Sequence, residues 1–407
     1  MQEFNILTLN NGIRFIHWQN DSKVVHCGIT INTGTRDEFE NEHGLAHFIE
    51  HVIFKGTTHR KAYHVISRLE DVGGDLNAYT AKEETCIYAT VLANDFERSA
   101  ELISDIVFNS TFPEKELAKE KEVVFDEINS YKDSPAELIF DDFEEQVFAG
   151  APIGRNILGS KKNLKAFTKQ SIQSFMQRTY NTDQMVFSSV GDIPFSKVKK
   201  VAEKYFGCMP ANIRSFTRIP FSGYAPTLVE KHKSTYQAHC IIGNIACDLK
   251  SDKRIALHLL NNLLGGPGMN SRLNLSLRER HGLAYNVEAS FTPYSDTGIV
   301  TVYFGTDKEN IERSMKIVQK ELTKVRDQKI SDLQLFKAKK QLVGQLAIAA
   351  ESNEGQMLSI GKSLLVYNSV DSLEEVAQKL DAVTAQDLIE AANEIFTPNQ
   401  LSTLIFR

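Results

Sequence analysis

Apolar and polar residues follow two periods along the first part of the chain. An apolar residue at every second position predicts a strand, and one at every third or fourth position predicts a helix. The alternating stretches predict strands over residues 4–9, 13–17, 24–32, 75–80 and 85–92. Asn10-Asn11-Gly12 lies between the first two, which predicts a hairpin. Helical spacing predicts one helix that ends near Gly56 and another over residues 62–72, followed by Gly73-Gly74.

Longer helical patterns fill the next hundred residues. They predict helices over residues 95–108, 113–148, 168–179 and 194–206, and an apolar run between the last two predicts a strand over residues 185–190. Pro135 should break or kink the longest of these helices, because proline lacks the backbone N–H that a helix interior needs. Residues 207–226 lose all periodicity and carry three prolines, which predicts a linker.

The second half of the chain repeats the order of elements in the first. We predict strands over residues 237–243, 284–292 and 298–304, a short strand at the end, and helices over residues 252–264, 271–279, 308–326, 331–351 and 372–395. The pattern therefore predicts an α+β protein with two duplicated domains, each an antiparallel-rich sheet with helices packed on it. The predicted ranges are 1–208, a linker over 209–226, and 227–407.

Composition limits the class of protein. Of the 407 residues, 42% are apolar and 24% are charged, as in a soluble globular protein, and the net charge of -6 gives no reason to expect nucleic-acid binding. The five cysteines show no CxxC spacing, so neither disulfides nor a thiolate zinc site are indicated. No signal peptide or membrane-spanning run is visible, so we expect a cytoplasmic protein without membrane insertion.

A polar triplet interrupts the apolar helix that ends near Gly56. In His47-Phe48-Ile49-Glu50-His51, the two imidazoles are one helical turn apart, and Glu50 shares their face. Two neutral imidazoles in this arrangement can bind one zinc ion, and a neighbouring carboxylate can take a proton from a water molecule on the metal. A lone histidine on an apolar face is usually a core residue, but three polar groups on one face are costly without a partner.

Two imidazoles leave zinc short of a third protein ligand. The candidates are His43, His64, Glu70, Asp71, Glu83, Glu84 and the acidic helix near residue 120. In that helix Glu120 and Glu127 lie two turns apart on one face. Glu127 could bind the metal while Glu120 holds either a ligand imidazole or the ligating carboxylate in place. A solvated acidic stripe would give the same spacing, so both interpretations stay open at this point.

The triplet and the distant acidic segment, residues 120–128, together resemble the pitrilysin family of inverted zinc metallopeptidases, which includes insulin-degrading enzyme and the mitochondrial processing peptidase. The resemblance extends to Asn10-Asn11-Gly12, to residues 73–80 and to residues 278–285. It implies a zinc-dependent metalloendopeptidase that cleaves peptides or unfolded segments in an enclosed chamber. It implies that His47, His51 and Glu127 bind one zinc ion per chain. It also implies that Glu50 is the general base and Glu120 the supporting acid. Arg278 and Tyr285 would contact the substrate near the scissile bond.

The resemblance also implies how the site is completed. It is closest to the short bacterial and mitochondrial branch, in which two two-domain chains enclose a chamber. We therefore expect a homodimer in which Arg278 and Tyr285 of one chain complete the site of the other, with a heterodimer as the alternative. Asn77, Ala78 and Tyr79 form a predicted strand that could pair with a peptide backbone. A non-catalytic assembly subunit on the same fold and a zinc hydrolase for another bond are the competing hypotheses.

Overall fold

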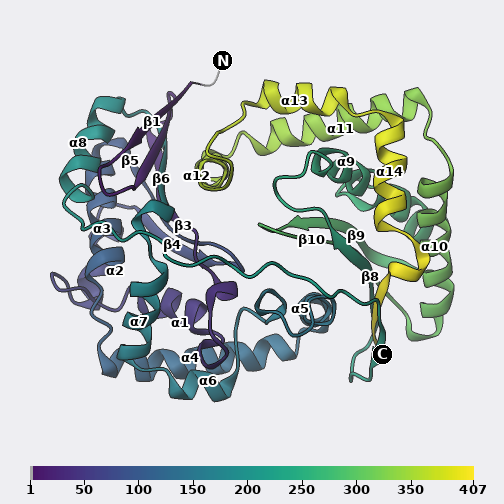
Figure 1. Ribbon diagram of the computed structural model, residues 1–407, viewed down its shortest axis with the longest axis horizontal. Coiled ribbons are helices and arrows are strands. Elements are labelled where there is room, and N and C mark those ends of the chain that lie inside the picture. The colour runs from purple at the N-terminus through teal and green to yellow at the C-terminus, as the bar shows by residue number, and fades with distance from the viewer. Residues whose placement is uncertain (1–2) are drawn as a thin grey trace. The chain divides into compact units, whose positions relative to one another are not determined.

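The computed structural model describes residues 3–407, and their contacts separate into two units (Figure 1). The first unit contains the chain up to Ile128, Arg155–Arg218 and Ala349–Ser372. The second contains Asn129–Gly154, Ile219–Ile348 and Leu373–Arg407. Each unit has one β-sheet with helices on both faces, so the predicted α+β class with two sheets is confirmed.

The first unit is built on a six-stranded sheet in the order β1-β2-β6-β3-β5-β4. Its strands are β1 (Phe4–Thr8), β2 (Arg14–Gln19), β3 (Val24–Ile31), β4 (Asp75–Thr80), β5 (Thr85–Leu92) and β6 (Met185–Gly191). The predicted hairpin is confirmed, because β1 pairs antiparallel with β2 from Phe4 opposite Trp18 to Thr8 opposite Arg14. β4 is an edge strand, with β5 as its neighbour.

Successive residues of a strand face opposite sides of the sheet. Apolar residues are buried on both sides, and helices therefore cover both faces. The helices are α1 (Leu45–Val52), α2 (Ala62–Glu70), α3 (Phe96–Asn109), α4 (Glu114–Lys132), α6 (Lys161–Ala166), α7 (Lys169–Thr179), α8 (Phe195–Tyr205) and α12 (Asn353–Tyr367). On β2, Phe15 joins the large core beneath α1, α3 and α8, whereas Ile16 faces α12. The sequence pattern predicts no element over α12, since glycine, which is a poor helix former, stands at positions 355 and 361.

The second unit repeats the topology of the first. Its sheet has the order β7-β11-β8-β10-β9, formed by β7 (Leu228–Lys231), β8 (Ala238–Ala246), β9 (Ala284–Pro293), β10 (Gly298–Thr306) and β11 (Ser402–Phe406). This order matches β2-β6-β3-β5-β4 strand for strand. The first pair is parallel in both sheets, and every following pair is antiparallel. The predicted duplication is therefore present in the strand order as well as in the succession of elements.

Helices also cover both faces of the second sheet. They are α5 (Pro135–Val147), α9 (Arg254–Gly265), α10 (Ile311–Asp327), α11 (Asp332–Ala349), α13 (Leu373–Ala382) and α14 (Ala385–Ile395), with a π-helical turn at Asn274–Glu279. α5 packs on one face through Ile139 and Phe143, and α9 and α14 pack on the other. The predicted break at Pro135 is confirmed by the end of α4 and the start of α5.

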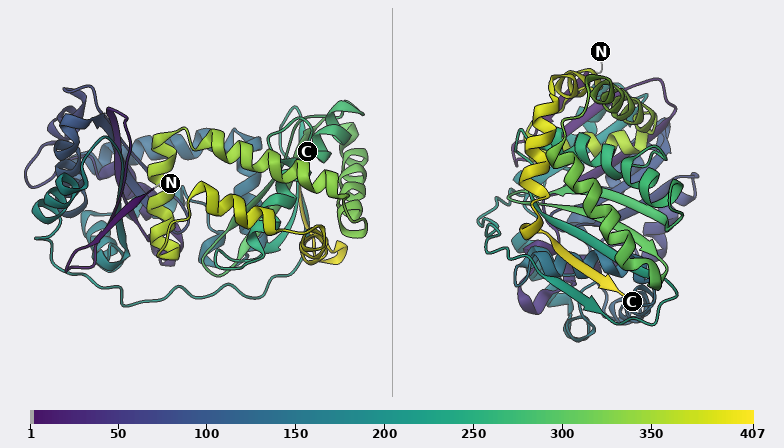
Figure 2. Two further views of the ribbon diagram at one scale, coloured as in Figure 1. Left: turned by 90° about the horizontal axis from the view of Figure 1, so that it is seen from above. Right: turned by 90° about the vertical axis from the view of Figure 1, so that its right-hand side faces the viewer.

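One predicted helix, residues 372–395, is wrong as a single element. It is divided into α13 and α14, because Thr384 starts a new helix and its hydroxyl accepts a hydrogen bond from the Asp387 N–H. The contact units also differ from the continuous ranges 1–208 and 227–407, since α5 counts with the second unit and α12 with the first. Residues 210–227, which include most of the predicted linker, form neither helix nor strand (Figure 2).

Across residues 3–407 no helix is both long enough and apolar enough to cross a membrane.

Candidate metal centre

α1 separates its apolar and polar residues onto different faces. Its apolar side chains enter the core of the first unit; they are Leu45, Ala46, Phe48, Ile49 and Val52. The remaining face carries His47, Glu50 and His51. His47 is buried, and the other two are half-buried. The triplet therefore shares one face of α1, because the apolar residues at the other positions are buried in the core.

The two imidazoles of α1 meet a carboxylate from α4. His47 Nε2 lies 3.3 Å from His51 Nε2. Glu127 Oε2 lies 3.6 Å from His47 Nε2 and 3.3 Å from His51 Nε2. Each residue thus offers one ligand atom to the same point. Within the described part of the chain, this is the group of three His, Cys, Asp or Glu side chains that converges closely enough to hold a metal ion.

The other candidates for a third ligand have partners elsewhere. The imidazole Nε2 of His43 lies 2.8 Å from the carbonyl oxygen of Asn156. Glu83 pairs with Arg36 at 2.7 Å, and Glu84 pairs with Lys362 at 2.9 Å. His64, Glu70 and Asp71 are not part of the converging group. Glu127 therefore lies beside both imidazoles, which agrees with the interpretation of the acidic stripe as a third ligand rather than as a solvated surface.

The protonation and bonding of this group fit a zinc ion. Burial, with a smaller contribution from the charge of His51, lowers the pKa of His47 to about 3, so its imidazole is neutral and can donate a lone pair. Glu127 Oε2, the oxygen that faces both imidazoles, is buried and makes no hydrogen bond. Buried polar atoms are rarely left without partners. Two nitrogens and one carboxylate oxygen are a ligand set that catalytic zinc sites use.

Glu50 lies next to the group without belonging to it. Burial raises the pKa of Glu50, and the charge of Glu127 raises it further, whereas Thr80 and the charge of His51 lower it. A carboxylate with a raised pKa is a better proton acceptor near neutral pH. Glu50 therefore lies beside the two histidines as a largely buried carboxylate with a raised pKa.

Glu120 lies on the opposite side of His51. Its Oε2 is 3.6 Å from His51 Nδ1, the ring nitrogen that points away from Glu127, and its Oε1 pairs with Lys55 Nζ at 2.7 Å. The 3.6 Å separation is longer than a hydrogen bond. The carboxylate therefore sits where it can favour one orientation of the His51 ring, while Lys55 offsets its charge.

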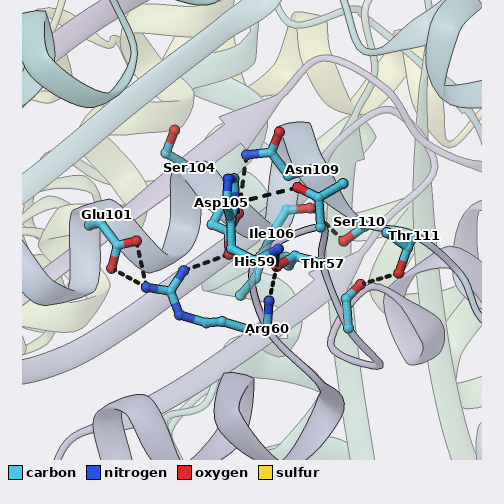
Figure 3. Close-up of polar contacts among 12 residues, drawn as sticks. Thr57, His59, Arg60, Glu101, Ser104, Asp105, Ile106, Asn109, Ser110 and Thr111 are labelled. Carbon is cyan, nitrogen blue, oxygen red and sulfur yellow. Dashed lines mark hydrogen bonds and ion pairs between the residues drawn. The ribbon is translucent and has the colours of Figure 1, made fainter.

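A polar cluster around Asp105 fastens the segment that follows α1 (Figure 3). The Asp105 carboxylate accepts hydrogen bonds from Thr57 at 2.7 Å and from Arg60 at 2.6 Å, and it lies 2.6 Å from His59 Nδ1. Arg60 also pairs with Glu101. These contacts join residues 57–60 to α3. The periodic pattern of the sequence does not predict these contacts, although an aspartate among the apolar residues of a predicted helix is a visible irregularity.

A second close contact fixes the segment that precedes α1. Gly44 and Gly159 face one another, and both have positive φ, +95° and +73°. A Cβ atom on Gly159 would lie 2.3 Å from the Gly44 Cα atom and 2.5 Å from the His43 carbonyl oxygen. Only glycine fits such an approach. The loop that ends at Gly159 therefore packs directly on the N-terminus of the helix that carries the histidines.

Gly159→Ala is expected to destabilise the protein by about 2–4 kcal/mol, since the methyl group meets backbone atoms and the left-handed conformation adds strain. Urea unfolding measures this loss. Gly73→Ala is the matched control, because Gly73 has the same φ of +73° and nothing within 4 Å of the added Cβ. Equal losses in the two variants would show that the contact between Gly44 and Gly159 contributes nothing.

The predicted substrate strand is β4, which passes α1 along the edge of the first sheet. Asn77 is exposed and donates a hydrogen bond to Asp75 at 3.0 Å, and Ala78 is half-buried. The Tyr79 hydroxyl donates to Glu84 at 3.2 Å. β4 ends at Thr80, beside Glu50. An edge strand that ends at the candidate base is thus available for pairing.

Arg278 and Tyr285 lie in the second unit. Arg278 is on the π-helical turn Asn274–Glu279, with its side chain 46% exposed and 3.8 Å from Glu279. Tyr285 is on the edge strand β9 and is 84% exposed. The Leu283 N–H donates to the Leu277 carbonyl oxygen at 2.9 Å, which ties the turn to the start of the strand. Both side chains are therefore presented to solvent.

Comparison with protein families gives two matches that together span most of the chain. Residues 15–161 match the family described as insulinase, peptidase family M16. Residues 166–342 match the family described as the peptidase M16 inactive domain. His47, His51 and Glu127 lie in the first match, and Arg278 and Tyr285 lie in the second.

Individual proteins match over nearly the full length. A protein of Bacillus subtilis described as an uncharacterized zinc protease is 33% identical, covering 98% of this chain and 97% of its own. One of Rickettsia felis with the same description is 33% identical, covering 99% and 98%. A solved protease from Helicobacter pylori superposes with a TM-score of 0.92 at 22% identity, covering 100% of both chains, which shows a common fold. The structure of a peptidase M16 inactive domain from Pseudomonas fluorescens gives the same score at 19% identity, covering 99% and 97%.

Proposed function

The chain belongs to the insulinase family of peptidases, peptidase family M16, and from this premise we propose that it is a zinc-dependent endopeptidase that cleaves peptides or unfolded polypeptide segments. The family predicted from the sequence is thereby confirmed. The observation that carries the proposed activity is the convergence of His47, His51 and Glu127 on one point, with Glu50 beside them. Uncharacterized zinc proteases among the full-length relatives support it.

In this proposal His47, His51 and Glu127 hold one zinc ion per chain. The ion, when bound, acts as a Lewis acid that lowers the pKa of a water molecule and polarises the scissile carbonyl group. Glu50 would accept a proton from the attacking water molecule as the oxygen of that water forms its bond to the carbonyl carbon. Glu50 then gives the proton to the amine nitrogen as the C–N bond breaks. Glu120 keeps the His51 ring in its orientation throughout.

The edge of β4 is the proposed binding site for the substrate backbone. An extended peptide can add to an exposed sheet edge through main-chain hydrogen bonds, which hardly depend on its side chains. Asn77, Ala78 and Tyr79 provide that edge next to Glu50. We therefore expect broad sequence specificity and a preference for unfolded segments over folded proteins.

We further propose a homodimer in which Arg278 and Tyr285 of one copy contact the substrate of the other; a heterodimer with a related chain is the alternative. The exposure of both side chains supports a role in contacts outside their own unit. Mixing inactive Glu50→Gln chains with inactive Arg278→Ala chains should recover activity at one site per mixed dimer. Native mass measurement verifies the mixed dimer, and no recovery in its presence would contradict completion by a second copy.

A non-catalytic assembly subunit is the second candidate, favoured by the match of residues 166–342 to an inactive domain. That match covers the half without the triplet, and the first half keeps both histidines, Glu127 and Glu50. Zinc content and cleavage of quenched fluorescent peptides separate the two candidates. We expect about one zinc ion per chain, and cleavage that a chelator abolishes and added zinc restores. Bound zinc without cleavage of a broad peptide panel would favour the assembly subunit.

A further inference from the structure

Glu38 lies in the buried loop before α1 and contacts the backbone at the start of that helix. Its Oε2 accepts a hydrogen bond from the Gly44 N–H at 2.9 Å, and its Oε1 accepts one from the Ala46 N–H at 2.8 Å. The residue is 3% exposed. Both carboxylate oxygens therefore accept hydrogen bonds from backbone groups that lie three residues and one residue before His47.

These two bonds replace a cap that α1 cannot provide itself. The first N–H groups of a helix have no partner within the helix, and a side chain at the N-cap usually accepts one of them. Here the N-cap is Gly44, which has no side chain. A helix of eight residues is too short to be stable by its own propensity. The first turn, which carries His47, thus depends on contacts from outside the helix.

The cost of burying this carboxylate indicates that its position matters. Burial raises the pKa of Glu38, with a smaller contribution from the charge of Glu42, whereas the Ala46 and Gly44 N–H groups and the charge of Arg155 lower it and favour the ionised form, which can accept both hydrogen bonds. Arg155 also donates a hydrogen bond to the Glu38 carbonyl oxygen at 3.1 Å. The partial positive charge at a helix N-terminus favours an anion at this place. A neutral side chain would avoid the burial cost but would leave an N–H group without an acceptor.

We propose that Glu38 is a positioning residue for the metal centre: its carboxylate fixes the first turn of α1 and thereby orients His47 toward His51 and Glu127. This inference rests on the proposed function, because it assigns Glu38 to the binding of zinc. It goes beyond general stabilisation of the fold. Glu38 contacts the backbone of the residue next to a metal ligand and reaches that ligand through the helix alone.

Glu42 is the matched control. It lies in the same loop, and its carboxylate pairs with Arg178 and accepts a hydrogen bond from the Phe39 N–H at 2.9 Å. It is also buried, with the residue 8% exposed. None of these contacts is with α1. Glu42→Gln therefore removes the same charge from the same loop and leaves both N–H groups of α1 bonded to Glu38.

The test measures the zinc dissociation constant by chelator competition, together with the thermal midpoint of the zinc-free protein. Glu38→Gln should weaken zinc binding about 10- to 100-fold, because the amide nitrogen cannot accept a hydrogen bond, so one of the two N–H groups loses its partner. Glu42→Gln should weaken it less than about threefold at a similar thermal midpoint. Unchanged zinc binding in Glu38→Gln, or an equal loss in both variants, would overturn the proposal.

A milder variant keeps the proposal testable if Glu38→Gln does not fold. Glu38→Asp retains the charge but is one methylene group shorter, so it should weaken zinc binding while the zinc-free thermal midpoint stays near that of the unaltered protein. Unchanged zinc binding in this variant would contradict the positioning role. If the unaltered chain itself bound no zinc, the proposed function would fail first, and the two failures are thereby distinguished.

Discussion

Glu50→Gln is expected to retain zinc and to lower kcat about 10²- to 10⁴-fold, the range that general acid–base catalysis contributes. Glutamine has nearly the shape of glutamate, but its amide can neither take a proton from water nor return one to the leaving amine. The group proposed to hold the metal consists of His47, His51 and Glu127, so the substitution leaves all three side chains unchanged. Steady-state cleavage of a quenched peptide and the zinc content of the same sample measure the two effects.

The control for this variant is Glu70→Gln, an exposed carboxylate at the end of α2 that is not part of the converging group. It should cleave the peptide at the rate of the unaltered protein. A Glu50→Gln protein that cleaves at that rate would remove Glu50 from the role of base. One that has lost its zinc would show that Glu50 acts on the metal site rather than on the proton.

The local part of the site could be predicted from the sequence. His47, Glu50 and His51 fall within one turn of one helix, so the period of the apolar residues alone determines that they share a face. The same holds for Glu120 and Glu127, which lie two turns apart on α4. What spacing could not decide was whether that second face meets the first or lies in solvent. That question concerns the packing of α4 against α1, and the family resemblance supplied an answer before the structure did.

The supporting contacts could not be predicted, because they join residues that are far apart in the sequence. Gly44 packs on Gly159, and residues 57–60 bond to Asp105, and neither contact leaves a periodic pattern. The sequence did not predict α12, because its glycines weaken the helical pattern. The helix is stabilised by packing on the apolar face of the first sheet. Helix stability in such cases comes from tertiary packing rather than from propensity.

The second large effect concerns the carboxylates of α4, which approach different nitrogen atoms of the two imidazoles. Glu127→Gln is expected to weaken zinc binding at least about 10³-fold, since it removes one of three protein ligands from a metal whose total binding free energy in proteins is of order 10 kcal/mol. Glu120→Gln should weaken it only about 10- to 100-fold, since its oxygen is 3.6 Å from the ring nitrogen that faces away from Glu127. Chelator competition measures both.

Glu122→Gln supplies the baseline for this pair, because Glu122 lies on the same helix, between the other two, and is exposed. It should leave zinc binding unchanged. The expected order of loss is therefore Glu127, which approaches both Nε2 atoms, then Glu120, which approaches Nδ1 of His51, then the exposed Glu122, and it does not follow their order along α4. Equal losses at Glu127 and Glu120 would mean that α4 contributes its negative charge as a whole. In that case the approach of Glu127 Oε2 to both Nε2 atoms would not define a ligand.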